Sequence, residues 1–169
     1  MEFEDTPEYK QSIKMQLACT KAFMYKFNIS ENNIIRYDKK NNLHILDTNF
    51  HIDGKIILPN GSTLTMQEKA LSNKFYKFKT FTMEFYQNRN TKEKGEFFKI
   101  ASQIYLHGYS DETEVEFIEY YILKVFDLML WINNKYTILE LEQNMRNAGG
   151  SYATFISIPY KDIPEHIFY

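Results

Sequence analysis

Apolar residues recur at helical spacing near the start of the chain. Five positions follow one another at intervals of four, three, four and three residues, as expected of one helical face. They are Ile13, Leu17, Thr20, Met24 and Phe27. Pro7 suits the first position of a helix, and Asp5 or Thr6 can cap the free N–H groups, with Glu8 completing a capping box. The pattern predicts a long amphipathic helix over residues 7–26.

The middle of the chain carries shorter runs that are typical of strands. Residues 28–42 hold no sustained period, which favours a loop. Four β-prone runs follow, and a Pro-Asn-Gly-Ser turn at residues 59–62 joins the second run to the third. The expected strands are residues 43–52, 55–58, 63–71 and 78–86.

The last third mixes both patterns. Residues 116–132 are nearly all apolar, and their β-branched and aromatic start favours a strand through about Val125. The other expected elements are a helix at 95–109, a short helix at 137–146, a turn at 149–151 and a strand at 152–158. This order predicts an α/β (α+β) fold in one domain, residues 1–169, with a mixed central sheet flanked by helices. The order of elements is α-β-β-β-α-β with a late strand.

Composition narrows the class of protein. Apolar residues make up 44% of the chain and aromatic residues 17%, enough for a folded core. No run of 18 apolar residues exists, so no membrane span is expected, and the acidic start is unlike a secretory signal. With the single Cys19, these features favour a cytoplasmic location. The net charge of −2 is not that of a protein that coats nucleic acid, but it allows local binding.

The hairpin expected around residues 59–62 carries the main candidate chemistry. Because side chains alternate along a strand, Gln67 and Lys69 share one face while Met66 and Glu68 share the other. The turn brings Asp53 near the far end of the second strand. A carboxylate, an amide oxygen and an ammonium are thus expected close together. Oxygen ligands suit Mg²⁺, and a neighbouring lysine can neutralise charge on a phosphate.

Asp53, thirteen intervening residues and Gln67-Glu68-Lys69 resemble the signature of the PD-(D/E)XK nuclease superfamily. The resemblance implies a restriction-endonuclease-like fold: a helix, a hairpin with the motif, further strands and a crossover helix. It also implies that Asp53 and Gln67 bind Mg²⁺ (or Mn²⁺) and that Lys69 supports phosphodiester hydrolysis.

The chain departs from this signature in two places. Gln67 stands where the family usually has an acid, and Ile52 stands where it usually has proline before the Asp. Gln67 removes a negative charge from the metal site, which another carboxylate can restore. Three residues are candidates for this role, with Glu84 the one assigned to the metal set. They are Glu8, Glu68 and Glu84.

Basic residues after the hairpin are candidates for binding nucleic acid. They alternate with aromatic residues in KFYKFKTFTMEFYQNR, a pattern that suits both base stacking and an ordinary half-buried strand. The candidate residues are Lys77, Lys79, Arg89, Lys99 and Gln103.

Two functions from different classes follow. The leading hypothesis is an Mg²⁺-dependent nuclease acting on DNA, encoded by a phage or mobile element as the Asn, Lys and Ile richness suggests. The alternative is a nuclease-like fold that has lost catalysis and binds nucleic acid or a protein partner. A structural or host-interaction protein is a third possibility, and a homodimer is left open.

Overall fold

The computed structural model describes residues 7–37, 43–147 and 152–169, which form two β-sheets and the helices around them. The first sheet has five strands in the order β1-β2-β3-β6-β7 and the second has four in the order β5-β4-β9-β8. The first contains β1 (Ile34–Arg36), β2 (Gly54–Ile57), β3 (Thr63–Leu71), β6 (Ile104–Ser110) and β7 (Phe117–Lys124). The second contains β4 (Thr80–Asn88), β5 (Glu93–Lys94), β8 (Arg146–Asn147) and β9 (Thr154–Pro159).

The helices are short except for the first. The α-helices are α1 (Pro7–Phe27), α2 (His44–Phe50), α3 (Glu96–Lys99), α4 (Val125–Lys135) and α5 (Ile138–Gln143). The 3₁₀-helices are η2 (Glu31–Asn33), η4 (Asn73–Phe78), η5 (Tyr160–Asp162) and η6 (Glu165–Ile167). Among the described helices, none is both long and apolar enough to cross a membrane.

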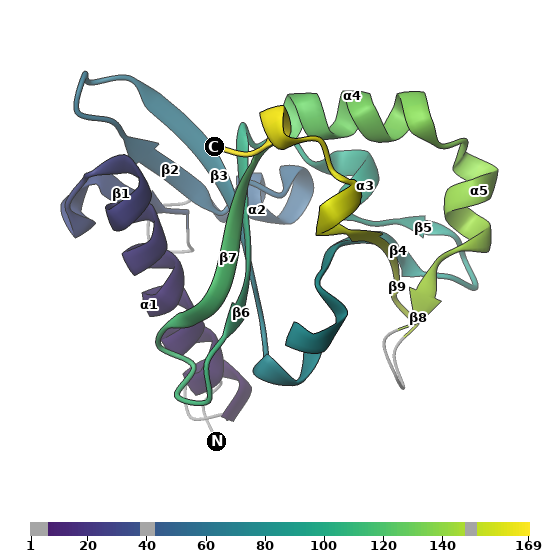
Figure 1. Ribbon diagram of the computed structural model, residues 1–169, viewed down its shortest axis with the longest axis horizontal. Coiled ribbons are helices and arrows are strands. Elements are labelled where there is room, and N and C mark those ends of the chain that lie inside the picture. Colours follow the sequence, from purple (N-terminus) through teal and green to yellow (C-terminus); the bar gives the residue numbers. More distant parts are fainter. Residues whose placement is uncertain (1–6, 38–42, 148–151) are drawn as a thin grey trace.

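The first sheet is mixed. β1, β2 and β3 pair antiparallel, β3 pairs parallel with β6, and β6 pairs antiparallel with β7. A parallel pair needs a long crossover, and here the chain from β3 to β6 passes through η4, β4, β5 and α3. Figure 1 shows α1 on one side of the first sheet and the second sheet on the other. The central strand β3 is therefore covered on both faces.

The face of the first sheet toward α1 has its own apolar cluster. Phe23 of α1 is fully buried against Ile56, Met66 and Leu106, which come from β2, β3 and β6. These positions alternate along each strand with residues of the opposite face. The amphipathic helix expected at residues 7–26 is confirmed by this packing.

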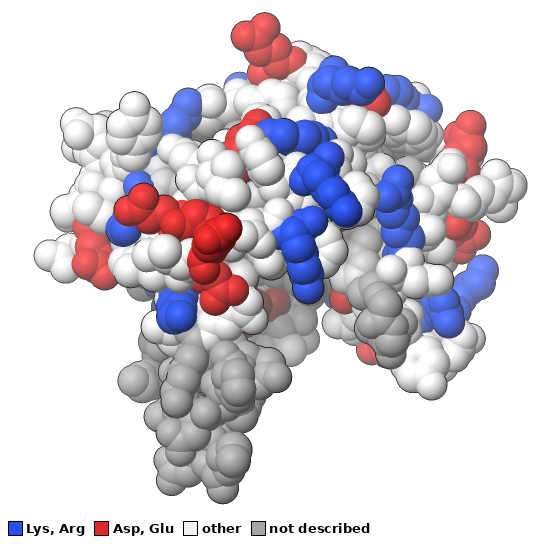
Figure 2. Space-filling view, turned by 60° about the horizontal axis from the view of Figure 1, so that its bottom comes forward, with Lys and Arg blue, Asp and Glu red and all other residues white. Residues whose placement is uncertain are grey.

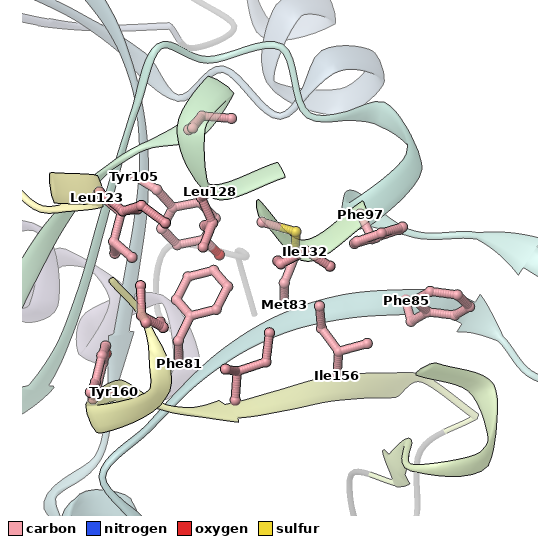
Figure 3. Packing of buried hydrophobic residues seen from close by; sticks show 14 of the residues in the cluster. Phe81, Met83, Phe85, Phe97, Tyr105, Leu123, Leu128, Ile132, Ile156 and Tyr160 are labelled. Atoms are coloured by element: carbon pink, nitrogen blue, oxygen red, sulfur yellow. The ribbon is translucent and has the colours of Figure 1, made fainter. Parts of the chain in front are cut away.

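The space between the sheets holds the larger cluster. Phe81 and Met83 of β4 point toward Tyr105, Leu123 and the α4 residues above them (Figure 3). The rings of Phe81 and Tyr105 meet edge to face, with centroids 5.3 Å apart. Burying a side chain of this size contributes about 1.5–3 kcal/mol, so this contact joins the sheets firmly.

Most of the expected elements are present. Strands at 55–58 and 63–71, the turn between them and the helix at 137–146 correspond to β2, β3, that turn and α5. The apolar run at 116–132 divides into β7 and α4 at Val125, as its residue types indicated. The mixed α+β class with a helix-flanked sheet is confirmed. The turn expected at 149–151 and the cap at Asp5 or Thr6 lie outside the described residues.

The strand expected at residues 43–52 is wrong, because this segment contains α2. The strand that pairs with the free edge of β2 is β1, which lies in the segment expected to be a loop. Without a strand partner, the segment closes helical hydrogen bonds instead. It ends at His51, whose φ of 49° lies in the left-handed region and whose N–H donates to the Asp47 carbonyl.

The helix expected at residues 95–109 is also wrong beyond its first turn. Only α3 is helical, and β6 follows. Every residue of β6 is buried, so the strand shows an apolar run without the period-two pattern that identifies a half-exposed strand. The crossover helix implied by the family resemblance is thus a four-residue helix and a strand in this segment.

The strands expected at residues 78–86 and 152–158 exist as β4 and β9, but they pair with each other in the second sheet. The 3₁₀-helix η4 separates β3 from β4 and turns the chain onto the other layer. Period-two alternation specifies a strand and its buried face, but not the sheet that the strand joins.

The contact between the sheets predicts a large loss of stability when its centre is truncated. Phe81→Ala should lower the free energy of unfolding by about 3–5 kcal/mol, because the cavity left by the ring cannot fill completely. Phe126→Ala, which removes a ring of α4 that is 77% exposed, is the matched control and should change it by less than about 0.5 kcal/mol. Urea unfolding followed by circular dichroism measures both. Equal losses would contradict this assignment of the core.

Candidate functional site

The two faces of β3 carry different chemistry. Gln67 and Lys69 pair with Tyr105 and His107 of β6 and lie on the face toward the second sheet. Glu68 lies between them in sequence and points to the α1 side, where Arg36 binds it. The alternation that the sequence predicted for Gln67 and Lys69 is therefore present. It places Lys69 between two β-sheets.

Lys69 lies in a partly dry environment with acids nearby. Its Nζ is 4.6 Å from the ring centroid of Phe155 on β9. Burial lowers the pKa of the Lys69 ammonium, while the negative charges of Glu96 and Glu84 raise it. Among the residues that the structure describes, no carboxylate reaches within 4.0 Å of this ammonium to form an ion pair. The two acids thus act on the lysine electrostatically without forming an ion pair with it among the described residues.

Several buried polar atoms in this region have no hydrogen-bond partner within the described part of the chain. Three of them are Gln67 Oε1, Glu96 Oε1 and the Tyr105 hydroxyl. The last two are neighbours, because burial and then interaction with Glu96 raise the pKa of Tyr105. Gln67 is 9% exposed and Glu96 only 4%. Buried polar groups are nearly always hydrogen-bonded, so unpartnered oxygens that converge indicate a place for water, an ion or a ligand. We call Gln67, Lys69, Glu84, Glu96 and Tyr105 the inter-sheet site.

Glu96 is the functional candidate that sequence reasoning missed. It begins α3, and its Oε2 accepts the backbone N–H of Glu84 at 3.4 Å. Gly95 makes this approach possible, since a Cβ there would lie 2.9 Å from the carbonyl oxygen of Glu84. The sequence carries no signal for this role, because Glu96 falls inside the helix expected at residues 95–109 and its position depends on the approach of Gly95 to Glu84.

Glu84 is the candidate compensating acid that does lie at the site. Burial raises the pKa of its carboxyl group, the Lys69 charge lowers it, and the Glu96 charge raises it again. His51 and Lys99 are also close enough to Glu84 to influence its carboxyl group. His51 Nε2 is another buried atom without a partner among the described residues. Two carboxylates and a lysine thus lie within electrostatic range of one another.

Asp53 does not join this group. Its Oδ2 accepts the backbone N–H of Glu68 at 2.6 Å, so this oxygen lies near the plane of the sheet at the end of β2. It lines a pocket of about 400 Å³ on the α1 side together with Arg36, Asp47 and Glu68. The arrangement of Asp53, Gln67 and Lys69 on one face, expected from the sequence, is therefore not the one in the structure. The irregular end of β2 is the reason, because Asp53 bonds to β3 through its side chain.

We call Arg36, Asp47, Asp53 and Glu68 the carboxylate pocket. Arg36 holds Glu68 through two hydrogen bonds, from Nε at 3.0 Å and from Nη2 at 2.6 Å. Burial, and then the charge of Glu68, raise the pKa of Asp53 to about 8. Glu68 is thus already occupied by Arg36, and Asp53 beside it is easier to protonate than an ordinary carboxyl group because its pKa is raised.

The metal set expected from the sequence was Asp53, Gln67 and Glu84. Over residues 7–37, 43–147 and 152–169, no three His, Cys, Asp or Glu side chains are grouped to hold a metal ion. The inter-sheet site offers the carboxylates of Glu84 and Glu96 and the unpartnered amide oxygen of Gln67. Two carboxylates with waters and substrate oxygens are a usual Mg²⁺ environment. The role of these residues as metal ligands stays a prediction.

The candidates for nucleic-acid binding are divided among several places. Lys77 is exposed on η4, and Arg89 is exposed at the end of β4. Lys79 is held in an ion pair by Glu119. Lys99 lies beside the inter-sheet site, with its Nζ 3.4 Å from Gln87.

Two further candidates have other positions. Gln103 has a structural role, because its Oε1 accepts the Thr65 N–H at 2.9 Å and so joins β3 to the start of β6. Glu8 belongs to the first turn of α1, and its side chain is outside the part of the structure that is described. Neither residue contributes a described contact to the inter-sheet site.

Asp53 predicts a particular dependence of stability on pH. A carboxyl group with a folded-state pKa near 8 and an unfolded-state value near 4 holds its proton only when folded between these pH values. It therefore costs stability as pH rises through this window, by up to about 1.4 kcal/mol per pH unit. Asp53→Asn keeps an oxygen for the Glu68 N–H and should be more stable than wild type at pH 8 relative to pH 5. Urea unfolding at both pH values measures this, and a pH-independent difference would contradict it.

Comparison with known proteins gives no further assignment. No protein-family model, no curated protein and no solved structure matches this chain. The resemblance of Asp53, Gln67 and Lys69 to the PD-(D/E)XK nuclease superfamily stays a prediction from the sequence. Roles for individual residues are therefore argued from their contacts, burial and charge.

Proposed function

We propose that the protein is a divalent-metal-dependent phosphodiester hydrolase that acts on nucleic acid, with DNA expected from the family resemblance. One observation carries the proposal: Lys69 lies within electrostatic range of Glu84 and Glu96, and Gln67 on the same face of β3 has a buried amide oxygen without a partner among the described residues. Three of these four residues, Gln67, Lys69 and Glu84, are also candidates from the sequence alone. A purely structural cluster would pair its buried charges.

Gln67, Glu84 and Glu96 are the residues that would hold Mg²⁺ or Mn²⁺. Glu84 and Glu96 restore the charge that an acid at position 67 would supply, which is why a neutral amide is acceptable there. When bound, the ion polarises a phosphoryl oxygen and favours ionisation of a bound water. Tyr105 adds a buried hydroxyl that neighbours Glu96.

Lys69 would act on the phosphate. Its ammonium is held in a poorly solvated place, where a fixed charge acts more strongly than in water. Glu84 and Glu96 help to keep it charged against the effect of burial. The aromatic ring of Phe155 limits its movement. Lys69 is therefore placed to neutralise the charge that develops on a phosphodiester during hydrolysis.

Asp53 would be a positioning residue. By accepting the Glu68 N–H it fixes the backbone of β3 between Gln67 and Lys69. Its replacement would act through the geometry of these two side chains. This role differs from the direct metal binding that the family resemblance implies for Asp53.

A second function has some support. Gln67 is neutral, and the described residues offer two carboxylates at the site rather than three. The same chain could then bind nucleic acid without cleaving it. Metal binding separates these alternatives, because a site that has lost catalysis should not be stabilised by Mg²⁺ or Mn²⁺.

Cleavage is the direct test of Lys69. Lys69→Met keeps the length of the side chain and removes its charge, and should lower the rate of DNA cleavage in Mg²⁺ or Mn²⁺ by about 10²–10³-fold, as for loss of one transition-state charge contact. Lys14→Met, at an exposed position of α1, is the matched control and should cleave like wild type. Circular dichroism checks that both variants fold. Equal rates for Lys69→Met and wild type would exclude the assigned role.

Metal binding tests the two acids independently of cleavage. At 100 times its dissociation constant, Mg²⁺ or Mn²⁺ should stabilise the wild type by about 2.7 kcal/mol. Glu84→Gln and Glu96→Gln should each remove most of this gain, whereas Glu165→Gln, at an exposed position of η6, should keep it. Thermal unfolding with and without metal gives the comparison. No stabilisation of the wild type by either ion would favour the binding function over catalysis.

A further inference from the structure

The 3₁₀-helix η4 presents an exposed surface of alternating basic and aromatic side chains. Lys74, Phe75, Lys77 and Phe78 are all exposed, and the two rings are 41% and 47% accessible to solvent. We call these four residues the η4 surface. It lies at the lower end of the molecule in Figure 1, the end that Figure 2 turns toward the reader. On that face, basic side chains form a row separate from a group of acids.

Each lysine of the η4 surface lies beside one of its rings. Lys74 Nζ is 5.0 Å from the ring centroid of Phe75, and Lys77 Nζ is 5.2 Å from that of Phe78. Within the described residues, neither lysine forms an ion pair. The next lysine along the chain differs, because Lys79 is bound by Glu119. The surface therefore contains two similar pairs, each made of one aromatic ring and one lysine that is free to bind an anion.

The turn that carries this surface is anchored to the core. Tyr76, between the two exposed rings, packs against the larger apolar cluster between the sheets. Its ring meets that of Tyr109 edge to face, with centroids 5.7 Å apart. Phe75 N–H donates to the Ser72 carbonyl and Lys79 N–H to the Tyr76 carbonyl, which closes the turn. Phe75 and Phe78 are thus held outward on a fixed support. Neither one is needed to fill the core.

The η4 surface is connected to the inter-sheet site through both of its strands. η4 joins β3, which carries Lys69, to β4, which carries Glu84. At about 3.3 Å per strand residue, Lys69 is within about 13 Å of the start of η4, and Glu84 is about 20 Å or less from its end. The η4 surface therefore lies within the reach of a few nucleotides from the residues of the inter-sheet site.

We propose that the η4 surface binds a single-stranded segment of nucleic acid, with bases stacked on Phe75 and Phe78 and phosphates at Lys74 and Lys77. Stacking platforms combined with basic side chains are the usual means of holding single strands. A duplex covers the faces of its bases, so the exposed rings would have nothing to stack on. The inference rests on the proposed function, because it takes the bound strand to be the substrate of the inter-sheet site. It adds that the substrate is single-stranded where it crosses η4.

Binding is measured separately from cleavage. Fluorescence anisotropy with a labelled 20-nucleotide oligo(dT) in EDTA, using the whole chain, gives dissociation constants without hydrolysis. Phe75→Ala with Phe78→Ala should weaken binding by at least about 10-fold, the usual effect of losing base stacking. Phe126→Ala, which removes a ring that is 77% exposed on α4, is the matched control and should leave binding unchanged. All of these positions are exposed, and thermal unfolding confirms that each variant folds.

The salt dependence tests the lysines. Lys74→Gln with Lys77→Gln should weaken binding and reduce the slope of log affinity against log salt by about 1.4, since two phosphates of a single strand contribute about 0.7 each. Lys14→Gln should leave the slope unchanged. The same oligonucleotide as a duplex should bind at least about 10-fold more weakly to the wild type.

Three results would overturn the inference: no effect of the double phenylalanine variant, equal affinity for the duplex, or preferential binding to vesicles of anionic lipid. Failure of the proposed function looks different. If the wild type binds oligo(dT) through η4 but never cleaves it with Mg²⁺ or Mn²⁺, the η4 surface stands and the hydrolase proposal fails. If it cleaves and the phenylalanine variant has an unchanged KM, the hydrolase stands and the η4 inference fails.

Discussion

The packing of Phe81 on Tyr105 determines where the chemistry of this protein can lie. That contact brings β4 and β9 over the first sheet and excludes water from the face that also carries Gln67 and Lys69. Side chains on a strand alternate between its two faces. Because Met66 and Glu68 lie on the α1 face, Gln67 and Lys69 lie on the covered face. The second sheet therefore forces an amide and an ammonium into a poorly solvated place. The same sheet then supplies Glu84, and the chain after it supplies Glu96.

The opposite face of β3 carries a buried acid that is paired with an arginine. Glu68 points toward α1, where an isolated buried carboxylate would be costly, and Arg36 of β1 offsets its charge with two hydrogen bonds. Asp53 adds a second acid at the same place, and burial with the charge of Glu68 keeps its pKa near 8. One strand thus separates a pocket in which Arg36 pairs with Glu68 from a site whose Lys69 forms no ion pair among the described residues. That difference is why the inter-sheet site, and not the pocket, is assigned the chemistry.

Local patterns were sufficient for elements whose periodicity reflects one exposed and one buried side, such as α1 and β3. They failed where burial or the order of strands in the sheet determines the secondary structure. β6 is buried throughout, so it carries no period, and residues 44–50 became a helix because β1 already occupied the edge of β2. At the site, alternation placed Gln67 with Lys69, but it could not show that Asp53 bonds to the backbone of Glu68. Glu96 could not be found from the sequence, because its place depends on the close approach of Gly95 to Glu84.

The neutral residue at position 67 has a physical explanation in this arrangement. An acid there would be a third carboxylate beside Glu84 and Glu96, with Lys69 as the nearest cation. In a poorly solvated site, each added like charge raises the pKa values of its neighbours and favours their protonated forms, which are poor metal ligands. An amide oxygen offers a ligand without that repulsion. Gln67 is therefore what the site requires once two acids come from the elements that follow β3, and it need not be read as a sign of lost activity.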